Sequence, residues 1–474
     1  MKTQDFWHLD IYGSYINGEL RTNPSEDLIS LLTQKPWKKI HKASVQDTRD
    51  AIQSAENALK IWREVPPKEK GNILRQVASL LLNQREALAE LMAYEMGKTK
   101  RDGLAEVAYA AGFFSWFAGE AIRLYEPQIK TGQKTIHHLK EPVGVCGLIT
   151  PWNFPLAMPA RKFGAALAAG CSVVLKPSPE CPLSALFMAA ACTEAGIPPG
   201  VVNIVIGPED DIGRELLSSP IVRKIGFTGS TSVGKYLYEH SASTLKKLTL
   251  ELGGHAPVII HDDADLDHAV EQAMIAKYRN NGQTCAAANR FYVQESVQDQ
   301  FIEKFVKRVK TLKIGDPLEP DTDLTTILHP SVPDKVQRHV EDAVRQGGEV
   351  VLFATEVYEP VVIKNVTHKM LVTQEETFGP VAPIISFKDE EGAYQMANDT
   401  PYGLTAYLFT QNYTKIQRGI RQLDFGIIGV NDGLPSSPQL SFGGCKASGF
   451  GVEGGPYGID EYLVSKCASV YSAD

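Results

Sequence analysis

The sequence predicts an α/β protein with two doubly wound parallel sheets. Short apolar runs alternate with helical stretches twice, first from residue 143 and again from residue 256. Alternation of this kind is typical of βαβ units and therefore of parallel sheets. The chain has 474 residues, of which 43% are hydrophobic and 22% charged, an ordinary globular composition. Such a length accommodates about two or three domains.

Residues 45–125 are predicted to be helical. An apolar stripe at helical spacing runs from Ala51 to Trp62, and a second stripe begins at Leu74. Two prolines at 66–67 separate these two helices.

The first sheet is predicted from four strand-like runs, at 144–149, 172–175, 202–206 and 224–227, with helices at 157–168, 183–195 and 211–218. Ligands of such sheets bind at the carboxyl ends of the strands, where loops lead into helices. A second lobe is predicted from strands at 256–260 and 291–294 and helices near 265–277 and 297–312. The junction lies near Gly253 and Gly254. Residues 431–459 look like ordered loop, and residues 462–471 like a final strand.

Composition and charge exclude several classes of protein. The 48 basic and 56 acidic residues give a net charge of −8, which argues against nucleic acid or an anionic membrane as the main partner. The chain has no signal-peptide core and no apolar run long enough to cross a membrane. Seven cysteines, an odd number without a CxxC pair, predict neither a disulfide framework nor a metal site. We therefore expect a cytoplasmic protein without a structural metal.

Cys285 is the best candidate for a nucleophile. Polar residues precede it in Asn-Asn-Gly-Gln-Thr, and three alanines follow it, so its sulfur can face a cleft. Cys445, next to Lys446 in a glycine-rich loop, is its rival. The cysteines at 146, 171, 181 and 192 lie in apolar or loop settings that are typical of inert thiols.

Glu251 has two interpretations. It ends a strand-like run and precedes Leu252, Gly253 and Gly254. The two glycines let backbone approach closely, so the carboxylate is a candidate general base. The alternative is a solvated glutamate at the end of a strand.

The segment from Gly226 to Lys235 is a glycine-rich turn between a strand and a helix. The N-terminus of such a helix can hold a phosphate through its backbone N–H groups and its dipole. The segment lacks GxGxxG but fits GxxxxGK, the pattern of a P-loop. Tyr236 stands where a P-loop needs Ser or Thr for Mg²⁺. A P-loop-like nucleotide-binding protein is therefore a distant alternative.

The acidic run at 262–267 suggests a calcium loop at first sight. Counted from Asp263, His268 and Met274 stand where an EF-hand needs Gly and Glu. The interpretation we favour is a set of acids at a helix N-terminus, where they complement the dipole.

Taken together, several motifs resemble those of the aldehyde dehydrogenase superfamily over essentially the whole chain. They stand in the family's order and spacing, at 150–155, 175–178, 227–230, 250–254, 282–285, 375–380 and 442–444. The resemblance implies a cofactor-binding domain of residues 1–124 and 141–253 and a catalytic domain of residues 254–455. It also implies a small β flap for oligomerisation, residues 125–140 and 456–474, and a homodimer or homotetramer.

The resemblance also implies a mechanism. Cys285 attacks an aldehyde as thiolate, and the Asn153 amide and the Cys285 backbone N–H hold the oxyanion. A hydride leaves to a nicotinamide ring, and Glu251 activates the water that hydrolyses the thioester. CoA-acylating relatives typically lack this base, so the expected product is a free acid.

The implied cofactor is NAD or NADP. By resemblance its contacts are Trp152, Lys176, Ser178, Pro179, Gly229, Ser230, Leu252, Glu376 and Phe378. Relatives that prefer NAD often carry Glu three residues after the lysine. Pro179 stands there, which removes the repulsion of a 2′-phosphate, although the neighbouring Glu180 can still bind a ribose.

Within the superfamily the chain looks most like succinate-semialdehyde dehydrogenases. Arg161, Arg279 and Ser436 occupy the positions that bind the substrate carboxylate there. A structural role in ion pairs is the alternative for both arginines. Glutarate semialdehyde, another ω-oxo acid or a neutral aliphatic aldehyde remain alternative substrates, and a non-catalytic binding protein on this fold is the alternative from another class.

Overall fold

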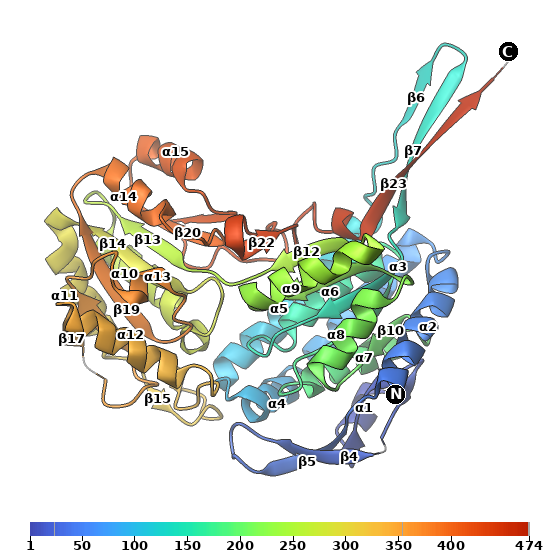
Figure 1. Ribbon diagram of the computed structural model, residues 1–474, viewed down its shortest axis with the longest axis horizontal. Helices are drawn as coiled ribbons and strands as arrows, with labels where there is room; N and C mark the ends of the chain where they lie inside the picture. Colours follow the sequence, from blue (N-terminus) through green and yellow to red (C-terminus); the bar gives the residue numbers. More distant parts are fainter. Residues whose placement is uncertain (23, 353, 473–474) are drawn as a thin grey trace.

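The protein consists of two α/β lobes and a projecting β flap (Figure 1). The computed structural model describes residues 1–22, 24–352 and 354–472. One lobe contains an eight-stranded sheet, the other a seven-stranded sheet, and the flap a three-stranded one. The predicted fold class is confirmed: both large sheets are parallel at their centres and are joined by helices.

The first lobe is wound around five parallel strands, in the order β12 (Lys247–Glu251), β11 (Val222–Thr228), β8 (Val145–Ile149), β9 (Ser172–Lys176) and β10 (Val202–Ile204). Antiparallel edges are added by β22 (Gly449–Phe450) and by the pair β2 (Tyr15–Ile16) and β3 (Glu19–Leu20). The connecting helices are α6 (Ala157–Ala168), α7 (Leu183–Glu194), α8 (Glu209–Ser218) and α9 (Thr231–Ser241). The strand order reverses between β8 and β11, and such a switch point is where a doubly wound sheet binds its ligand.

Four helices occupy the region in which we predicted two: α2 (Val45–Trp62), α3 (Pro67–Asn83), α4 (Arg85–Met96) and α5 (Lys100–Glu120). The break between α4 and α5 has a local cause. Gly97 ends α4 in the left-handed conformation, with φ 74°. Thr99 then caps α5 by accepting a hydrogen bond from the backbone N–H of Asp102 at 3.2 Å.

The second lobe has the strand order β17 (Glu349–Leu352), β18 (Val361–Lys364), β19 (Val381–Phe387), β14 (Ala288–Gln294), β13 (Ala256–Ile260), β20 (Thr405–Phe409) and β21 (Ile427–Val430). β17 pairs antiparallel with β18, and the remaining neighbours pair parallel. The predicted helices are α10 (Leu266–Tyr278) and α11 (Gln298–Val309). They are followed by α12 (Pro333–Arg345), α14 (Glu390–Asn398) and α15 (Tyr413–Gln422).

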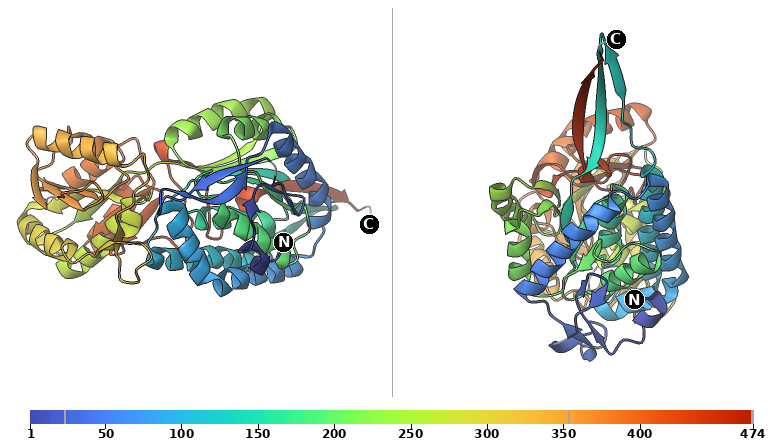
Figure 2. Two further views of the ribbon diagram at one scale, coloured as in Figure 1. Left: turned by 90° about the horizontal axis from the view of Figure 1, so that it is seen from below. Right: turned by 90° about the vertical axis from the view of Figure 1, so that its right-hand side faces the viewer.

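The flap projects away from both lobes (Figure 2). The predicted final strand is present as β23 (Leu463–Tyr471), and it pairs antiparallel with β7 (Lys134–Pro142), which in turn pairs with β6 (Gln128–Thr131). At the N-terminus, a small sheet of β1 (Ile11–Tyr12), β5 (Pro36–His41) and β4 (Ser25–Ile29) was not predicted. In the described part of the chain, no helix combines the length and apolarity needed to span a bilayer.

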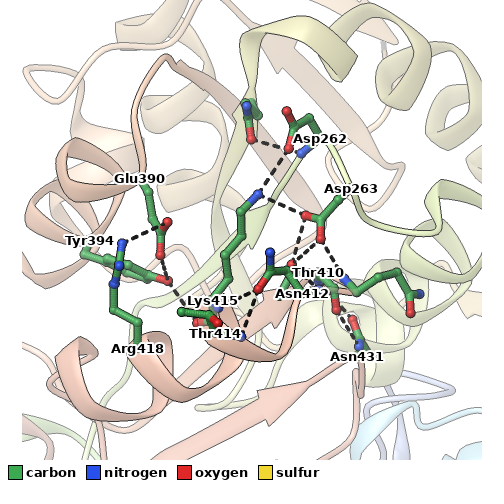
Figure 3. Close-up of polar contacts among 12 residues, drawn as sticks. Asp262, Asp263, Glu390, Tyr394, Thr410, Asn412, Thr414, Lys415, Arg418 and Asn431 are labelled. Carbon is green, nitrogen blue, oxygen red and sulfur yellow. Dashed lines mark hydrogen bonds and ion pairs between the residues drawn. The ribbon is translucent and has the colours of Figure 1, made fainter.

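The acidic run after β13 divides into two functions, and Figure 3 shows the one that involves Asp262 and Asp263. Asp265 caps α10 and accepts hydrogen bonds at 3.1 Å, as predicted for acids at a helix N-terminus. Asp262 and Asp263 instead pair with the Lys415 ammonium group, at 3.2 and 3.1 Å. Asp263 also accepts a hydrogen bond from Thr410, at the end of β20. Among the described residues, no group of His, Cys, Asp and Glu is placed to hold a metal ion.

The Asp263 contacts predict a pH-dependent contribution to stability. Partial burial raises the pKa of Asp263, but hydrogen bonds from Thr410 and Lys415 outweigh it and hold this pKa below its ordinary value. The contribution is therefore fully present above about pH 4 and is lost as the pH falls through the lowered folded-state pKa. We expect Asp263→Ala to lower the free energy of unfolding by about 1 kcal/mol at pH 7, since solvent screens part of the pair.

Urea unfolding of this variant and of wild type at pH 7 and pH 3 measures the effect. Asp321→Ala is the matched control, because Asp321 makes a fully exposed ion pair with Lys313 and should matter less. An Asp263→Ala deficit that is equally large at both pH values would contradict the assignment.

Candidate active site

A cavity of about 640 Å³ lies at the carboxyl ends of the first lobe's strands and is closed by loops of the second lobe. Parallel strands bring their carboxyl ends to one edge of a sheet, which explains why motifs far apart in sequence meet here. Of the residues predicted for the site, the cavity is lined by Trp152, Asn153, Arg161, Lys176, Ser178, Gly229, Ser230, Glu251, Leu252, Arg279, Cys285, Glu376, Phe378 and Ser436. Pro179, although described, is not among the lining residues.

Cys285 lies in the loop between α10 and β14. The backbone of this loop turns through Asn280 and Asn281, both left-handed with φ 52° and 56°, a conformation that asparagine tolerates. The loop also packs against Gly254, where a Cβ atom would lie 2.1 Å from the carbonyl oxygen of Cys285. The predicted close backbone approach is therefore present at Gly254, where its partner is the Cys285 loop, whereas Gly253 faces side chains.

Burial raises the pKa of the Cys285 thiol to about 12, and it is opposed by the positive charge of Arg161. Glu376 and Glu251 add to the rise, whereas Arg279 opposes it. The group is therefore a thiol near neutral pH in this arrangement, held between two guanidinium groups that favour its ionised form.

Glu251 ends β12 and is 2% exposed. The interpretation as a solvated strand-end carboxylate is therefore wrong. Both of its carboxyl oxygens lack a hydrogen-bond partner among the described residues. Burial and the nearby Glu453 raise its pKa well above the ordinary value, against the charges of Arg161 and Lys162. A buried, unpartnered carboxyl group with a raised pKa is suited to general base chemistry.

Asn153 presents its amide beside the Cys285 loop. Its Nδ2 donates a hydrogen bond to the carbonyl oxygen of Gln283 at 3.0 Å, and the residue is 6% exposed. The backbone N–H of Cys285 has no partner within the part of the chain that the structure describes. The two predicted oxyanion donors thus come from different lobes and meet at the same wall of the cavity.

The other end of the cavity fits a dinucleotide. Ser230 caps α9 by accepting from the backbone N–H of Val233 at 3.3 Å, so the first turn of this helix opens onto the cavity. Lys176, at the end of β9, is buried and forms an ion pair with Glu209. Glu376 accepts a hydrogen bond from Gly254 N–H at 3.0 Å, and burial raises the pKa of Glu376 to about 7.

The two arginines differ in their surroundings. Arg161 on α6 is 3% exposed, donates to the Tyr109 hydroxyl at 2.7 Å and lies 3.6 Å from a Glu453 carboxylate oxygen. Tyr109 also shares a 2.6 Å hydrogen bond with Ser436. Arg279 lies over the Phe154 ring at 5.3 Å and has no ion pair among the described residues. Arg161 therefore has an ion-pair partner, as the structural alternative expects, whereas Arg279 has none among the described residues.

Two contacts of the site were not predicted. Tyr109 bridges Arg161 and Ser436, and its only sequence signal is a hydroxyl-bearing aromatic among alanines. His329 stacks on Trp152 with ring centroids 4.0 Å apart and hydrogen-bonds Glu180 at 2.8 Å. No local sequence pattern predicts that His329 contacts the site, because His329 belongs to a loop of the second lobe.

The P-loop interpretation receives no support from this geometry. Lys235 is exposed and is not among the described residues that line the cavity.

Comparison with known proteins agrees with the arrangement. The model of the aldehyde dehydrogenase family matches residues 21–468. A glutarate-semialdehyde dehydrogenase of Pseudomonas putida is 44% identical over 96% of this chain and 98% of its own. A succinate-semialdehyde dehydrogenase (NADP(+)) of Escherichia coli is 43% identical over 95% and 96%. A solved succinate-semialdehyde dehydrogenase from Burkholderia pseudomallei superposes with a TM-score of 0.95 at 43% identity, covering 97% and 98%. The chain therefore belongs to the aldehyde dehydrogenase family.

Proposed function

We propose that this protein oxidises succinate semialdehyde to succinate with NAD or NADP, without acylating CoA. The observation that carries the proposal is one cavity lined by Cys285, Glu251, Asn153 and Arg279. Among the described residues, the Glu251 carboxyl group has no hydrogen-bond partner and the Arg279 guanidinium group pairs with no carboxylate. The first three of these four residues carry the groups needed for nucleophilic attack, water activation and oxyanion binding. The fourth is suited to a substrate carboxylate.

The residues act in a defined order in this proposal. Cys285 gives its proton to water, and its sulfur then bonds to the aldehyde carbon as the C=O π bond opens onto the oxygen. The negative charge on the former carbonyl oxygen is taken by the Cys285 N–H and by the Asn153 amide, whose second N–H is not used by the bond to the Gln283 carbonyl. After oxidation the carbon is held as a thioester on Cys285. Glu251 then accepts a proton from water, the hydroxide attacks this carbon, and the acid leaves as the C–S bond breaks.

The cofactor fits the groups at the far end of the cavity. A nicotinamide dinucleotide, when bound, accepts the hydride from the aldehyde carbon. The α9 N-terminus with Gly229 and Ser230 suits its pyrophosphate, Lys176 its ribose, and Glu376 with Phe378 the nicotinamide half. We propose these contacts together with Trp152, Ser178 and Leu252, and we propose no direct contact by Pro179.

Two semialdehydes satisfy the same chemistry. The relatives are named for succinate and for glutarate semialdehyde, which differ by one methylene. One methylene is worth only about 1–3 kcal/mol of discrimination, so glutarate semialdehyde stays the second candidate. A neutral aldehyde leaves Arg279 without a partner, which makes it the weaker choice.

Assembly, compartment and domain boundaries are proposals as well. Strands β6 and β23 of the flap are largely exposed and β7 between them is half-buried, and we propose that the flap forms the interface of a homodimer or homotetramer. Seven free cysteines suit a reducing cytoplasm. We propose a cofactor-binding domain of residues 1–124 and 141–253, a catalytic domain of 254–455 and a flap of 125–140 and 456–474.

The substrate assignment predicts a selective defect in Arg279→Met. Loss of a charged hydrogen-bonding partner should raise KM for succinate and glutarate semialdehyde about 10–100-fold. Turnover of propanal should stay within about twofold, because propanal has no carboxylate. The measurement is steady-state NAD(P)H formation with each aldehyde.

Arg214→Met is the matched control, since Arg214 lines the same cavity but pairs with Asp211. Equal effects of Arg279→Met on propanal and on the two semialdehydes that carry a carboxylate would contradict carboxylate recognition.

Cys285→Ala should abolish turnover and keep cofactor binding. Unchanged turnover in Cys285→Ala would contradict the nucleophile assignment.

The raised pKa of Cys285 predicts a steep pH dependence of its reactivity in the cofactor-free protein. Since its thiol pKa is about 12 in the folded protein, the thiolate fraction should grow about tenfold per pH unit between pH 7 and 10. The rate of alkylation by iodoacetamide measures this fraction. Cys285→Ala supplies the background from the exposed Cys467. A plateau below pH 9 would show that the ionised form already predominates.

The pair between Lys176 and Glu209 predicts cofactor selection. Glu209 places a negative charge where a 2′-phosphate would approach Lys176, in a region open to solvent. Glu209→Gln should therefore raise the ratio of kcat/KM for NADP to that for NAD about tenfold. Glu215→Gln, on the same helix but paired with Arg49 and not among the described residues that line the cavity, should leave the ratio unchanged. An unchanged ratio in Glu209→Gln would exclude Glu209 from this role.

A further inference from the structure

Three charged residues at the start of α5 and just before it are not used by the mechanism above. Lys98 precedes the Thr99 cap, and Asp102 and Glu106 lie four residues apart on one side of the helix. Their side chains do not turn to solvent. Each of them reaches a backbone segment that holds a proposed catalytic group.

Lys98 holds the backbone of Asn153. Its ammonium group donates to the Asn153 carbonyl oxygen at 2.8 Å and forms an ion pair with Glu106. Both side chains of this pair have 0% exposure. The ammonium also lies 4.0 Å from the centre of the Phe154 ring. A buried charge with this set of contacts fixes one peptide plane, that of Asn153.

Glu106 extends these contacts to the next helix. Its second carboxylate oxygen accepts hydrogen bonds from the backbone N–H groups of Leu156 and Ala157, at 2.9 and 3.0 Å. Ala157 is the first residue of α6. One carboxylate therefore binds Lys98 and caps α6, so the segment from Asn153 to Ala157 is held at both ends.

Asp102 connects the Cys285 loop to the contacts that Lys98 and Glu106 make around Asn153. Its carboxylate accepts a hydrogen bond from the backbone N–H of Asn280 at 2.9 Å. The Asn280 side chain in turn donates to the Asn153 carbonyl oxygen at 3.1 Å. The Asn153 carbonyl thus receives one donor from Lys98 and one from the loop of the nucleophile.

Stability alone does not account for the buried pair of Lys98 and Glu106. Taking both charges out of water is costly, and an apolar pair of similar volume is often as stable or more so. Orientation gives the missing reason. An oxyanion donor must sit at hydrogen-bond distance from the developing charge, and a displacement of about 1 Å can cost about a hundredfold in rate.

We propose that Lys98 and Glu106 are positioning residues that hold the peptide of Asn153 so that its side-chain amide faces the oxyanion. The proposal rests on the proposed function and deepens it. Neither residue is among the described residues that line the cavity. Both act through Asn153, and the effect of losing them should therefore depend on the presence of its amide.

The test uses a paired replacement, because Lys98→Met alone leaves a buried carboxylate without its counter-charge. The double variant Lys98→Met with Glu106→Gln removes both charges, and the glutamine oxygen can still accept from Leu156 and Ala157. We expect kcat for succinate semialdehyde to fall about 10–100-fold, with KM within about threefold. Cofactor affinity and the rate of Cys285 alkylation by iodoacetamide should not change, since neither uses the oxyanion site.

Lys70→Met is the matched control. Lys70 on α3 is also buried and donates to a backbone carbonyl, that of Arg63, away from the cavity. It should leave kcat unchanged. A fall in kcat equal to that of the double variant would overturn the proposal, because loss of any buried lysine would then suffice.

A double-mutant cycle with Asn153→Ala decides between positioning and general damage. In the Asn153→Ala background the paired replacement should have little further effect on kcat. An equal fall in both backgrounds, or a parallel loss of alkylation and cofactor binding, would overturn the proposal. If Asn153→Ala itself keeps full activity, the proposed function fails in its oxyanion step. If Asn153→Ala lowers kcat but the paired replacement does not, the positioning proposal fails and the proposed function stands.

Discussion

The close approach of Gly254 to Cys285 is the contact on which the site depends. A side chain at Gly254 would collide with the carbonyl oxygen of Cys285, at 2.1 Å from its Cβ. The chain crosses here from the first lobe to the second, between the end of β12 and the start of β13. Glu251 lies on one side of this crossing and the Cys285 loop on the other. The short segment between β12 and β13 therefore places the candidate base Glu251, from the first sheet, beside the loop of the candidate nucleophile Cys285, from the second.

Several titratable side chains are buried around this crossing, although a core built for stability alone would exclude them. Glu251 and Glu376 act on Cys285, and Glu453 acts on Glu251. The opposing charges are those of Arg161, Lys162 and Arg279. Burial keeps the thiol of Cys285 and the carboxyl groups of Glu251 and Glu376 closer to their neutral forms. Burying titratable groups such as these costs folding free energy, and their retention in a cavity is characteristic of a functional site.

The two lobes use the same topology differently. In the first lobe the carboxyl ends of the parallel strands open into the cavity. In the second lobe the carboxyl ends of β13 and β20 are instead occupied by Lys415 and its partners Asp262 and Asp263 (Figure 3). The second sheet contributes to the site from its opposite edge instead, because Cys285 lies in the loop that leads into β14. The cavity is thus formed where the carboxyl edge of one sheet meets the amino edge of the other.

The sequence by itself determined the alternation of strands and helices, the phosphate-type turn at Gly229 and Ser230 and the candidates Cys285 and Glu251. These are local properties: hydrophobic periodicity, turn chemistry and reactive side chains beside small residues. Only the tertiary structure decided that Glu251 is buried, that Arg161 is paired while Arg279 is not, and that Pro179 lies off the cavity. It also separated the Asp262 and Asp263 carboxylates from the helix N-terminus. The reason is physical: burial and ion pairing are set by partners such as Glu453, Lys415 and Glu209, which are distant in the chain and meet only after the sheets have formed.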